Sequence, residues 1–400
     1  MTMKILFVAM SESIHAARWI NQITNLGWDI RLYDSTDSGY INPQLQTATV
    51  YHSVYGSQPV LNPGVKRKGL WLPTGRTFAK RMLKRWHPDY PMRRLARLIQ
   101  DFQPDIIHSL ELQHSSYLVL EARKWLQANG VKHFPTWIIQ DWGNDIFLFN
   151  RLPQHQSRIY ELLQTANYYD CECERDVQNA LAIGMKAVPL PVLPNGGGVD
   201  IQAVTKMGEM ERTSVRRIIA VKGYQHWQGR VLFALRALAL CADVLQGYKI
   251  VIYSAFPAED IAIAAELLSQ EIGITVETMP GGQPHEEILR LFARSRLFLC
   301  ANITDGLSTA MVEAISVGAF PIQSNTACAD EWVTDGVTGF LVPPEDPQII
   351  AAAIRRALTD DTLVDKAAQL NAKICAERLD GAKIRQQVID IYQSIVKSPD

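Results

Sequence analysis

Several features that are common in protein sequences are missing from this chain of 400 residues. It contains no apolar run of the roughly 18 to 20 residues that a membrane-spanning helix needs. Its start has no separate charged region, apolar region and cleavage site, so we expect no signal peptide and a cytoplasmic protein. Its six cysteines lack the spacing of a zinc site, and the first strand–helix–strand pattern lacks Gly-x-Gly-x-x-Gly. A zinc knuckle and dinucleotide binding at the N-terminus are therefore not expected.

The bulk composition is that of a globular protein. The chain is 47% hydrophobic and 20% charged, with a formal net charge of −1. Its length suits two domains of about 150 to 200 residues each.

Short apolar runs alternate with amphipathic segments, and the pattern occurs twice. A glycine-rich and polar stretch, 195–214, separates the two halves, and we interpret its part 202–214 as a linker. The pattern predicts an α/β fold of two doubly wound, Rossmann-like domains that face a cleft. The predicted strands are residues 5–9, 28–33, 103–108, 137–140, 168–171, 217–222, 249–254, 274–278 and 296–301, and a further short strand begins at 320–322.

The stretch 302–341 carries the strongest signal for chemistry. A predicted strand ends at residue 301, a loop follows, and Ser308 stands where a helix N-cap is wanted. Residues 309–317 form the predicted helix, and Gly318 suits its C′ position. In open α/β sheets, ligands bind outside the carboxyl ends of the strands, and helix N-termini attract phosphate.

Two carboxylates frame this predicted site. Asp305 lies on the loop, and Glu313 follows eight residues later in the second turn of the helix. One carboxylate can hold hydroxyl groups at the loop end while the other holds a vicinal diol. Gly306 lets backbone approach a ligand closely. We expect phosphates to lie on the amides from Leu307 through Ser308 and Thr309 to Ala310.

This layout resembles the donor site of family 4 (group 1) glycosyltransferases, which are retaining enzymes with the two-Rossmann-domain GT-B fold. The family signature is Glu-x7-Glu followed by Ala, a small residue, Gly and Pro. Here Asp305-x7-Glu313 is followed by Ala314, Gly318 and Pro321. The first acid is one methylene shorter than the usual Glu. Further matches are Glu331, Asp335-Gly336-Val-Thr-Gly339, Pro343 and Asp346.

The resemblance implies glycosyl transfer from a nucleotide-diphosphate sugar with retention of anomeric configuration. Residues 1–200, with a crossover helix at about 382–400, would bind the acceptor, and residues 213–381 the donor. Asp305, Lys222 and Arg230 would act in catalysis, the two cations by stabilising the leaving diphosphate. The donor would be held by Glu313 and residues 306–309. No Asp-x-Asp motif occurs, so we expect neither a metal nor another cofactor.

The first half supplies candidates for contact with the acceptor. His15 and Arg18 belong to a segment similar to the first loop and helix of many family members, and His108 ends a predicted strand. Many relatives carry His-Gly-x-Asp or His-Gly-x-Glu where this chain has Trp142-Gly-Asn-Asp145. With Trp142 in the His position, either the site manages without that group or His15 or His108 supplies it.

Residues 66–97 concentrate positive charge. The segment contains eleven Lys and Arg residues but only one acidic residue, Asp89. The aromatic residues Trp71, Phe78 and Trp86 lie among the basic ones. Such a segment could bind an anionic membrane surface or an anionic acceptor. Alternatively, it could form a pair of solvent-exposed basic helices that bind neither. No nucleic-acid motif accompanies the charge, so no nucleic-acid partner is expected. The basic segment favours a lipid-linked or anionic acceptor at the inner face of a membrane, whereas the resemblance alone allows a glycan, a lipid-linked molecule or a small molecule.

Two other functions remain compatible with the sequence. A sugar-nucleotide epimerase shares the two-domain fold, but no carboxylates placed for elimination and re-addition are identified. A degenerate transferase could instead bind sugar nucleotides as a scaffold, because Asp305 and Trp142 both depart from the family pattern.

Overall fold

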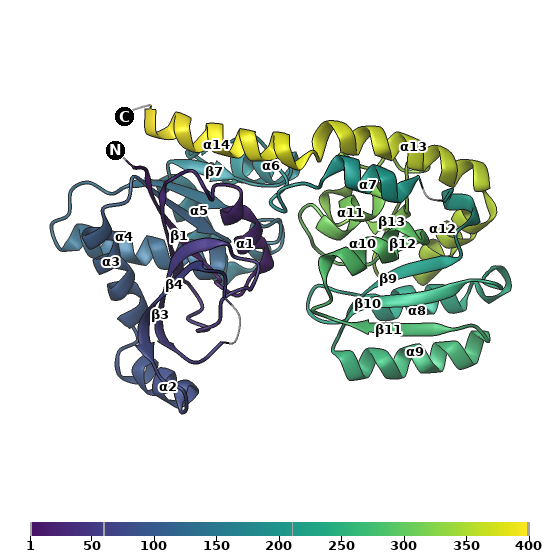
Figure 1. The fold of residues 1–400 in the computed structure, drawn as a ribbon, viewed down its shortest axis with the longest axis horizontal. Coiled ribbons are helices and arrows are strands. Elements are labelled where there is room, and N and C mark those ends of the chain that lie inside the picture. Colours follow the sequence, from purple (N-terminus) through teal and green to yellow (C-terminus); the bar gives the residue numbers. More distant parts are fainter. Residues whose placement is uncertain (1, 59–60, 210, 398–400) are drawn as a thin grey trace. The chain divides into compact units, whose positions relative to one another are not determined.

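The computed structural model describes residues 2–58, 61–209 and 211–397 of the chain. The chain divides into two compact units (Figure 1). The first unit contains the residues up to Gly197 and those from Lys383 onward, and the second runs from Gly198 to Ala382. No helix within these described ranges is both long enough and apolar enough to cross a membrane.

The first unit is built on an eight-stranded parallel sheet with the order β4-β3-β2-β1-β5-β6-β7-β8. The strand order reverses between β1 and β5, so the ends of these two strands form its switch point. The strands are β1 Lys4–Ala9, β2 Asp29–Asp34, β3 Thr47–Tyr55, β4 Gly64–Trp71, β5 Ile106–Leu110, β6 Thr136–Gln140, β7 Tyr168–Asp170 and β8 Val188–Pro189. The helices are α1 Ile14–Asn21, α2 Arg76–Trp86, α3 Tyr90–Phe102, α4 Tyr117–Ala128, α5 Pro153–Thr165 and α6 Glu174–Ile183.

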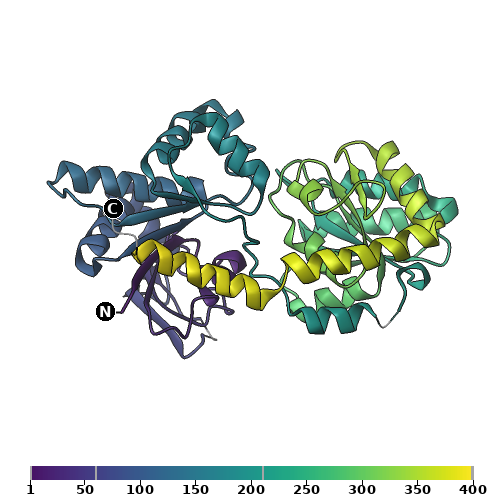
Figure 2. The ribbon, with the colours of Figure 1, turned by 90° about the horizontal axis from the view of Figure 1, so that it is seen from above.

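Helix α14, Gly381–Lys397, completes the first unit from the far end of the sequence. Figure 2 shows it in yellow beside the purple N-terminal elements. Its buried residues Ile384, Val388, Tyr392 and Ile395 join β1 and α1 in one hydrophobic cluster. The helix begins one residue before the predicted crossover segment 382–400 and covers it to Lys397, and positions 398–400 are outside the described residues.

The second unit contains a six-stranded parallel sheet with the order β11-β10-β9-β12-β13-β14. The order reverses between β9 and β12. The strands are β9 Ile218–Tyr224, β10 Lys249–Phe256, β11 Val276–Pro280, β12 Ser295–Cys300, β13 Phe320–Ser324 and β14 Phe340–Val342. The helices are α7 Ile201–Gly208, α8 Val231–Ala239, α9 Ala258–Ile272, α10 His285–Ala293, α11 Thr309–Ser316, α12 Pro347–Thr359 and α13 Asp361–Arg378.

Alternate residues of each central strand pack on opposite faces of this second sheet. Leu297 and Leu299 of β12 pack with α8, α9 and α12, whereas Phe298 and Cys300 pack with α10 and α11. Both faces are therefore covered by helices, which explains why these strands read as continuous apolar runs. The prediction of two doubly wound α/β domains is confirmed.

The predicted linker at 202–214 is wrong where the structure describes it. Asp200 caps α7 by accepting a hydrogen bond from the amide of Ala203 at 3.1 Å, and Val204 of this helix is buried in the second unit's core. Ile201 and Met207 pack against the same cluster, so the cap and a short apolar face together order this helix. Residue 210 lies outside the described residues.

The basic segment 66–97 is also not a pair of helices. Its first residues form β4, the edge strand of the first sheet, and only the remainder forms α2 and most of α3. Exposed and half-buried residues alternate from Gly64 to Lys68 with the two-residue period of a strand, although three consecutive residues there are charged.

Candidate active site

The switch point of the second sheet brings together Lys222 and Asp305. Lys222 lies near the end of β9, and Asp305 lies on the loop that follows β12, the neighbouring strand. The Lys222 ammonium is 4.0 Å from Asp305 Oδ2 and 4.9 Å from the centre of the Tyr224 ring. Both side chains are largely but not completely buried, with 14% and 17% exposed. The edge of the sheet thus holds a cation and a carboxylate that keep some access to solvent.

Lys222 keeps its charge in this setting. Burial acts to lower its pKa, but the surrounding acidic groups, Cys300, Asp305, Tyr224 and Glu313, outweigh burial and raise the pKa above its usual value. Burial raises the pKa of the Cys300 thiol to about 11, so this thiol is neutral near pH 7. The two carboxylates therefore supply the effective negative charge, and Lys222 remains a cation.

The loop that carries Asp305 is fixed by amide side chains. Asn302 Nδ2 donates to Asp305 Oδ2 at 3.1 Å, and Gln228 Nε2 donates to the carbonyl of Thr304 at 2.8 Å. The amide of Ile303 in turn donates to the carbonyl of Gln228 at 2.9 Å. These bonds tie the loop after β12 to the segment after β9, so the two ends of the switch point form one structure. Our sequence predictions did not include Asn302 or Gln228.

Ser308 occupies the N-cap position of α11, but its hydroxyl caps no backbone amide. The side chain is buried, and its Oγ has no hydrogen-bond partner in the part of the chain that the structure describes. The first amides of a helix also lack partners within the helix. Leu307 is buried beside it and Thr309 is half-buried. A hydroxyl donor and helix amides are thus gathered at one helix end, which suits an anion.

Glu313 lies one turn further along α11 and is paired with a residue that the sequence did not single out. Its Oε1 is 2.8 Å from His285 Nε2, at the first residue of α10, and the Glu313 side chain is 8% exposed. The sequence feature that could have pointed to His285 is the glycine- and proline-rich loop before it. Such a loop marks a strand-to-helix connection at the same edge of the sheet as Asp305. His285 orients the carboxylate on which the family signature depends.

Arg230 is placed differently from Lys222. Its Nε forms an ion pair with Glu345, and its Nη1 donates to the carbonyls of His226 and Gly229, both at 3.0 Å. His226 is close enough to Lys222 and Arg230 for their charges to change its pKa. Burial lowers the pKa of His226, and the charges of Lys222 and Arg230 lower it further. The predicted diphosphate clamp of Lys222 and Arg230 stays a prediction, with Arg230 already engaged by a carboxylate.

The first unit places His15 beside Trp142. Their rings lie 5.6 Å apart, at the N-terminus of α1 and just after β6, and Trp142 Nε1 donates to Gln140 Oε1 at 2.9 Å. Arg18, one turn further along α1, is half-buried. His15 thus adjoins the position in which relatives carry histidine, and its contact with an acceptor stays a prediction.

His108 is a core residue rather than a ligand contact. Its ring is 1% exposed, and its Nδ1 lies 2.6 Å from the Tyr392 hydroxyl of α14. Burial lowers its pKa to about 3, so the imidazole is neutral. The expectation that His108 touches the acceptor is not supported, because His108 lies in the middle of β5, where Tyr392 of α14 covers it.

Asp145 also faces inward. Its Oδ2 accepts hydrogen bonds from the amides of Leu112 at 3.1 Å and Trp142 at 3.0 Å, and the residue is 3% exposed. Burial raises its pKa well above the usual value, and nearby Asp141 and Glu111 raise it further. Asp145 therefore joins the loops after β5 and β6, and direct contact with an acceptor is not supported.

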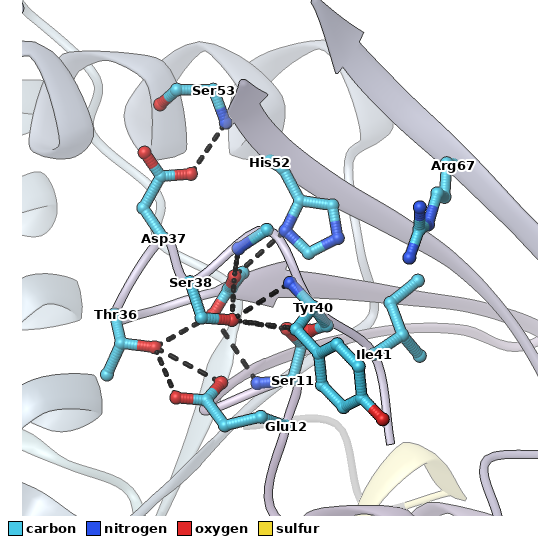
Figure 3. A network of polar contacts seen from close by, with 12 residues as sticks. Ser11, Glu12, Thr36, Asp37, Ser38, Tyr40, Ile41, His52, Ser53 and Arg67 are labelled. Carbon is cyan, nitrogen blue, oxygen red and sulfur yellow. Dashed lines mark hydrogen bonds and ion pairs between the residues drawn. The ribbon is translucent and has the colours of Figure 1, made fainter. Parts of the chain in front are cut away.

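A second polar network lies at the ends of β2 and β3 (Figure 3). Asp34 Oδ2 is 2.8 Å from His52 Nδ1, and both side chains are fully buried. Asp34, Asp37 and His52 are close enough to share a metal ion. However, protein donors already fill the Asp34 carboxylate; they are the Ser38 and Thr36 hydroxyls, the amides of Gly39 and Ser11, and His52. The network serves as a buried anchor for the loop 34–41.

Comparison with known proteins finds relatives of parts of this chain. Residues 230–374 match the family model described as glycosyl transferases group 1. A putative colanic acid biosynthesis glycosyltransferase, WcaL of Salmonella typhimurium, is 28% identical over 29% of this chain and 30% of its own length. An α-maltose-1-phosphate synthase of Mycobacterium tuberculosis is 22% identical over 40% of each chain. The matches thus span well under two thirds of these curated relatives.

Solved structures match over almost the whole chain. Anabaena Alr3699/HepE in complex with UDP-glucose has a TM-score of 0.66 and 16% identity, covering 98% of this chain and 100% of that one. Sucrose-phosphate synthase from Thermosynechococcus elongatus has a TM-score of 0.69 and 14% identity, covering 99% and 100%. These likenesses establish the GT-B fold. The segment that matches the group 1 glycosyltransferase model lies within the second unit of this fold.

Proposed function

We propose that the protein transfers a sugar from a nucleotide-diphosphate sugar to an acceptor, with retention of anomeric configuration. The observation that carries the proposal is the convergence of Lys222, Asp305 and the N-terminus of α11 at the switch point of the second sheet. A cation, helix amides and a carboxylate at one sheet edge suit a diphosphate joined to a sugar.

Each group in this site has a distinct role in the proposed reaction. Lys222 and the unpartnered Ser308 hydroxyl stabilise the departing diphosphate, whose charge grows as the glycosidic bond breaks. Asp305 accepts hydrogen bonds from sugar hydroxyls, and Glu313, oriented by His285, accepts from the ribose diol. The acceptor hydroxyl passes its proton to the leaving phosphate oxygen, so the reaction needs neither a separate base nor a metal.

The first unit would bind the acceptor. Two curated relatives carry names that refer to polysaccharides, the colanic acid enzyme and the amylovoran enzyme AmsK of Erwinia amylovora. A glycan or a lipid-linked sugar chain is the acceptor class that these names suggest. We place the enzyme in the cytoplasm, at the inner face of the membrane, because of the surface formed by β4 and α2.

This surface is both basic and apolar. Helix α2 buries none of its residues, and the side chains of Leu70, Trp71, Phe78 and Trp86 are 56–68% exposed. Arg81, Lys84 and Arg85 accompany them on α2. Exposed aromatic residues among cations favour the interface of an anionic membrane. We expect Arg81→Glu combined with Lys84→Glu and Arg85→Glu to reduce sedimentation with anionic liposomes at least tenfold; unchanged sedimentation contradicts the contact.

A stability screen tests the donor site. The full chain and Glu313→Ala are melted with UDP, GDP and ADP and with their sugar conjugates, and Glu259→Ala on the surface of α9 is the control. A ligand at 100 times its dissociation constant adds about 2.7 kcal/mol to the unfolding free energy. We expect one nucleotide family to stabilise the natural chain and the control but not Glu313→Ala.

Two further results complete this test. Turnover of the stabilising donor in the presence of EDTA supports a reaction without a metal. Stabilisation without turnover over a panel of acceptors favours a binding subunit, and no stabilisation by any nucleotide sugar contradicts the proposed donor site.

A further inference from the structure

Two guanidinium groups meet at the carboxyl ends of β3 and β4 in the first unit. Arg67 Nη1 donates to the carbonyl of Gly56 at 2.9 Å, and its Nη2 bonds Gln58. Arg76, the first residue of α2, reaches the same glycine: a Cβ atom built on Gly56 would lie 3.1 Å from Arg76 Nη1. The missing side chain of Gly56 therefore leaves the space in which the two arginine heads approach each other.

Lys80 lies beside this pair. Its ammonium donates to the carbonyl of Asp37, and a Cβ atom built on Gly39 would lie 3.1 Å from Lys80 Nζ. Asp37, Asp34 and Glu12 act on Lys80, so this cation has carboxylates near it. Burial nevertheless lowers its pKa, and the charge of Arg76 acts in the same direction.

Arg67 and Arg76 have no such compensation. The hydrogen bonds of Arg67 go to neutral acceptors, and neither arginine forms an ion pair with any residue that the structure describes. Burial lowers the pKa of Arg67; Tyr55, whose ring centre lies 5.3 Å from the guanidinium, acts to raise it, and the neighbouring Arg76 lowers it further. Two half-buried cations held together without a counter-charge are unfavourable, and an anion bound between them would remove the repulsion.

Two buried nitrogens in the same place have no partner. Arg67 Nε and His52 Nε2 make no hydrogen bond within the described part of the chain, although both are buried. His52 is fully buried and uses its other nitrogen for Asp34. Figure 3 shows its unpartnered nitrogen on the side of the ring that faces Arg67. Buried nitrogens are normally hydrogen-bonded, so these two indicate a ligand that supplies oxygen atoms.

We propose that Arg67 and Arg76, with Lys80 beside them, bind a phosphate group of the acceptor substrate. The planar guanidinium fork matches the spacing of phosphate oxygens and gives two parallel hydrogen bonds, and two forks at Gly56 can bind one phosphate from two sides. The assignment to the acceptor rests on the proposed function, because the donor site lies in the second unit. The phosphate is that of either a free sugar phosphate or a lipid headgroup.

Calorimetric titration of the full chain with inorganic phosphate and with glycerol 3-phosphate tests the site. We expect Arg67→Gln and Arg76→Gln each to weaken both ligands about tenfold or more, as for loss of a charge-assisted hydrogen bond. Lys132→Gln, which removes one exposed positive charge from the same unit, should change binding less than twofold. Arg76→Gln keeps the proposal testable if Arg67→Gln does not fold, because α2 buries none of its residues.

Vesicles with and without phosphatidic acid distinguish the two sources of phosphate. Competition by glycerol 3-phosphate against these vesicles, lost in Arg76→Gln, supports a lipid headgroup in the site, whereas binding of glycerol 3-phosphate without competition supports a free phosphate. No phosphate binding, or an equal loss in Lys132→Gln, overturns the site. Arginine-dependent phosphate binding in a chain that binds no nucleotide sugar keeps the site and refutes the proposed function instead.

Discussion

The two sheets of this protein place polar residues at the same edge but bury them to different extents. In the second unit, Lys222 and Asp305 remain 14% and 17% exposed and are held by neighbouring amides. In the first unit, His108 and Asp170 are 1% exposed, and Asp145 is 3% exposed and bonded to backbone. Position in the topology therefore shows where chemistry can occur. Burial alone does not decide which residues take part, because Ser308 is 2% exposed and yet its hydroxyl has no partner among the described residues, whereas Asp145 is bonded to two backbone amides.

Replacing Lys222 should have the largest effect. Because Lys222 faces the predicted diphosphate and Arg230 is already paired with Glu345, we expect Lys222→Ala to lower kcat/KM about 100- to 1000-fold and Arg230→Gln less than about tenfold. Steady-state rates with the donor found by the stability screen measure both, with Arg236→Gln on α8 as the control. Equal losses of kcat/KM in the two variants would instead support the sequence-based prediction that both cations bind the diphosphate.

Replacing Asp170 tests burial in the first unit through pH. Burial raises the pKa of Asp170 to about 7 and lowers that of His108 to about 3. Between about pH 4 and 6.5, the folded state binds an extra proton at Asp170, which stabilises it as pH falls. The unfolded state binds one at His108, which destabilises the fold over the same range. The two effects oppose each other in the natural chain.

In Asp170→Asn only the effect of His108 remains. The unfolding free energy should then fall by up to about 1.4 kcal/mol per pH unit between pH 6.5 and 4. Urea unfolding at pH 4.5, 5.5 and 6.5 measures it, with the natural chain giving a flatter dependence. Parallel curves for the two proteins would show that the pKa of Asp170 is not raised in the fold.

Tyr392→Phe tests the covering of the first sheet by α14. The Tyr392 hydroxyl lies 2.6 Å from His108 Nδ1 and 3.0 Å from Trp19 Nε1, so its removal leaves buried nitrogens without a partner. We expect a loss of about 1 to 3 kcal/mol of unfolding free energy, with donor binding unchanged. Tyr160→Phe, at an exposed position of α5, is the control. A loss of donor affinity without a loss of stability would place Tyr392 in the functional machinery.

Ser308→Ala should have the smallest effect on stability. Its hydroxyl already lacks a partner, so the unfolding free energy should change by less than about 0.5 kcal/mol. Nucleotide binding should nevertheless weaken about two- to tenfold, because a neutral hydrogen bond to the phosphate contributes about 0.5 to 1.5 kcal/mol. Calorimetric titration measures it. Unchanged affinity would show that the hydroxyl does not meet the ligand.

Much of the fold could be predicted from the sequence. Buried parallel strands appear as apolar runs, and the helix at Thr309 is marked by Ser308 before it and Gly318, with φ of +86°, after it. The helix α7 was missed because its apolar face, formed by Ile201, Val204 and Met207, spans only two turns of a largely polar segment.

The candidate site was predictable only where residues close in sequence form it. Asp305 and Glu313 share one loop and helix, so their spacing carries information. His285 meets Glu313 from another helix, and Tyr392 covers His108 from 284 positions away. Such partners depend on tertiary packing, which the local pattern around either residue does not encode.

The return of α14 to the first unit has a consequence for synthesis. A ribosome releases residues up to Gly197 long before it makes Tyr392, so the first sheet must wait through the whole second unit with the sites for Trp19 and His108 unfilled. Domains usually fold in the order in which they leave the ribosome. Here the first unit leaves the ribosome first but can complete its fold only after the second unit has been made. A chain that stops near Ala382 would therefore carry a complete second unit attached to an uncovered, aggregation-prone first one.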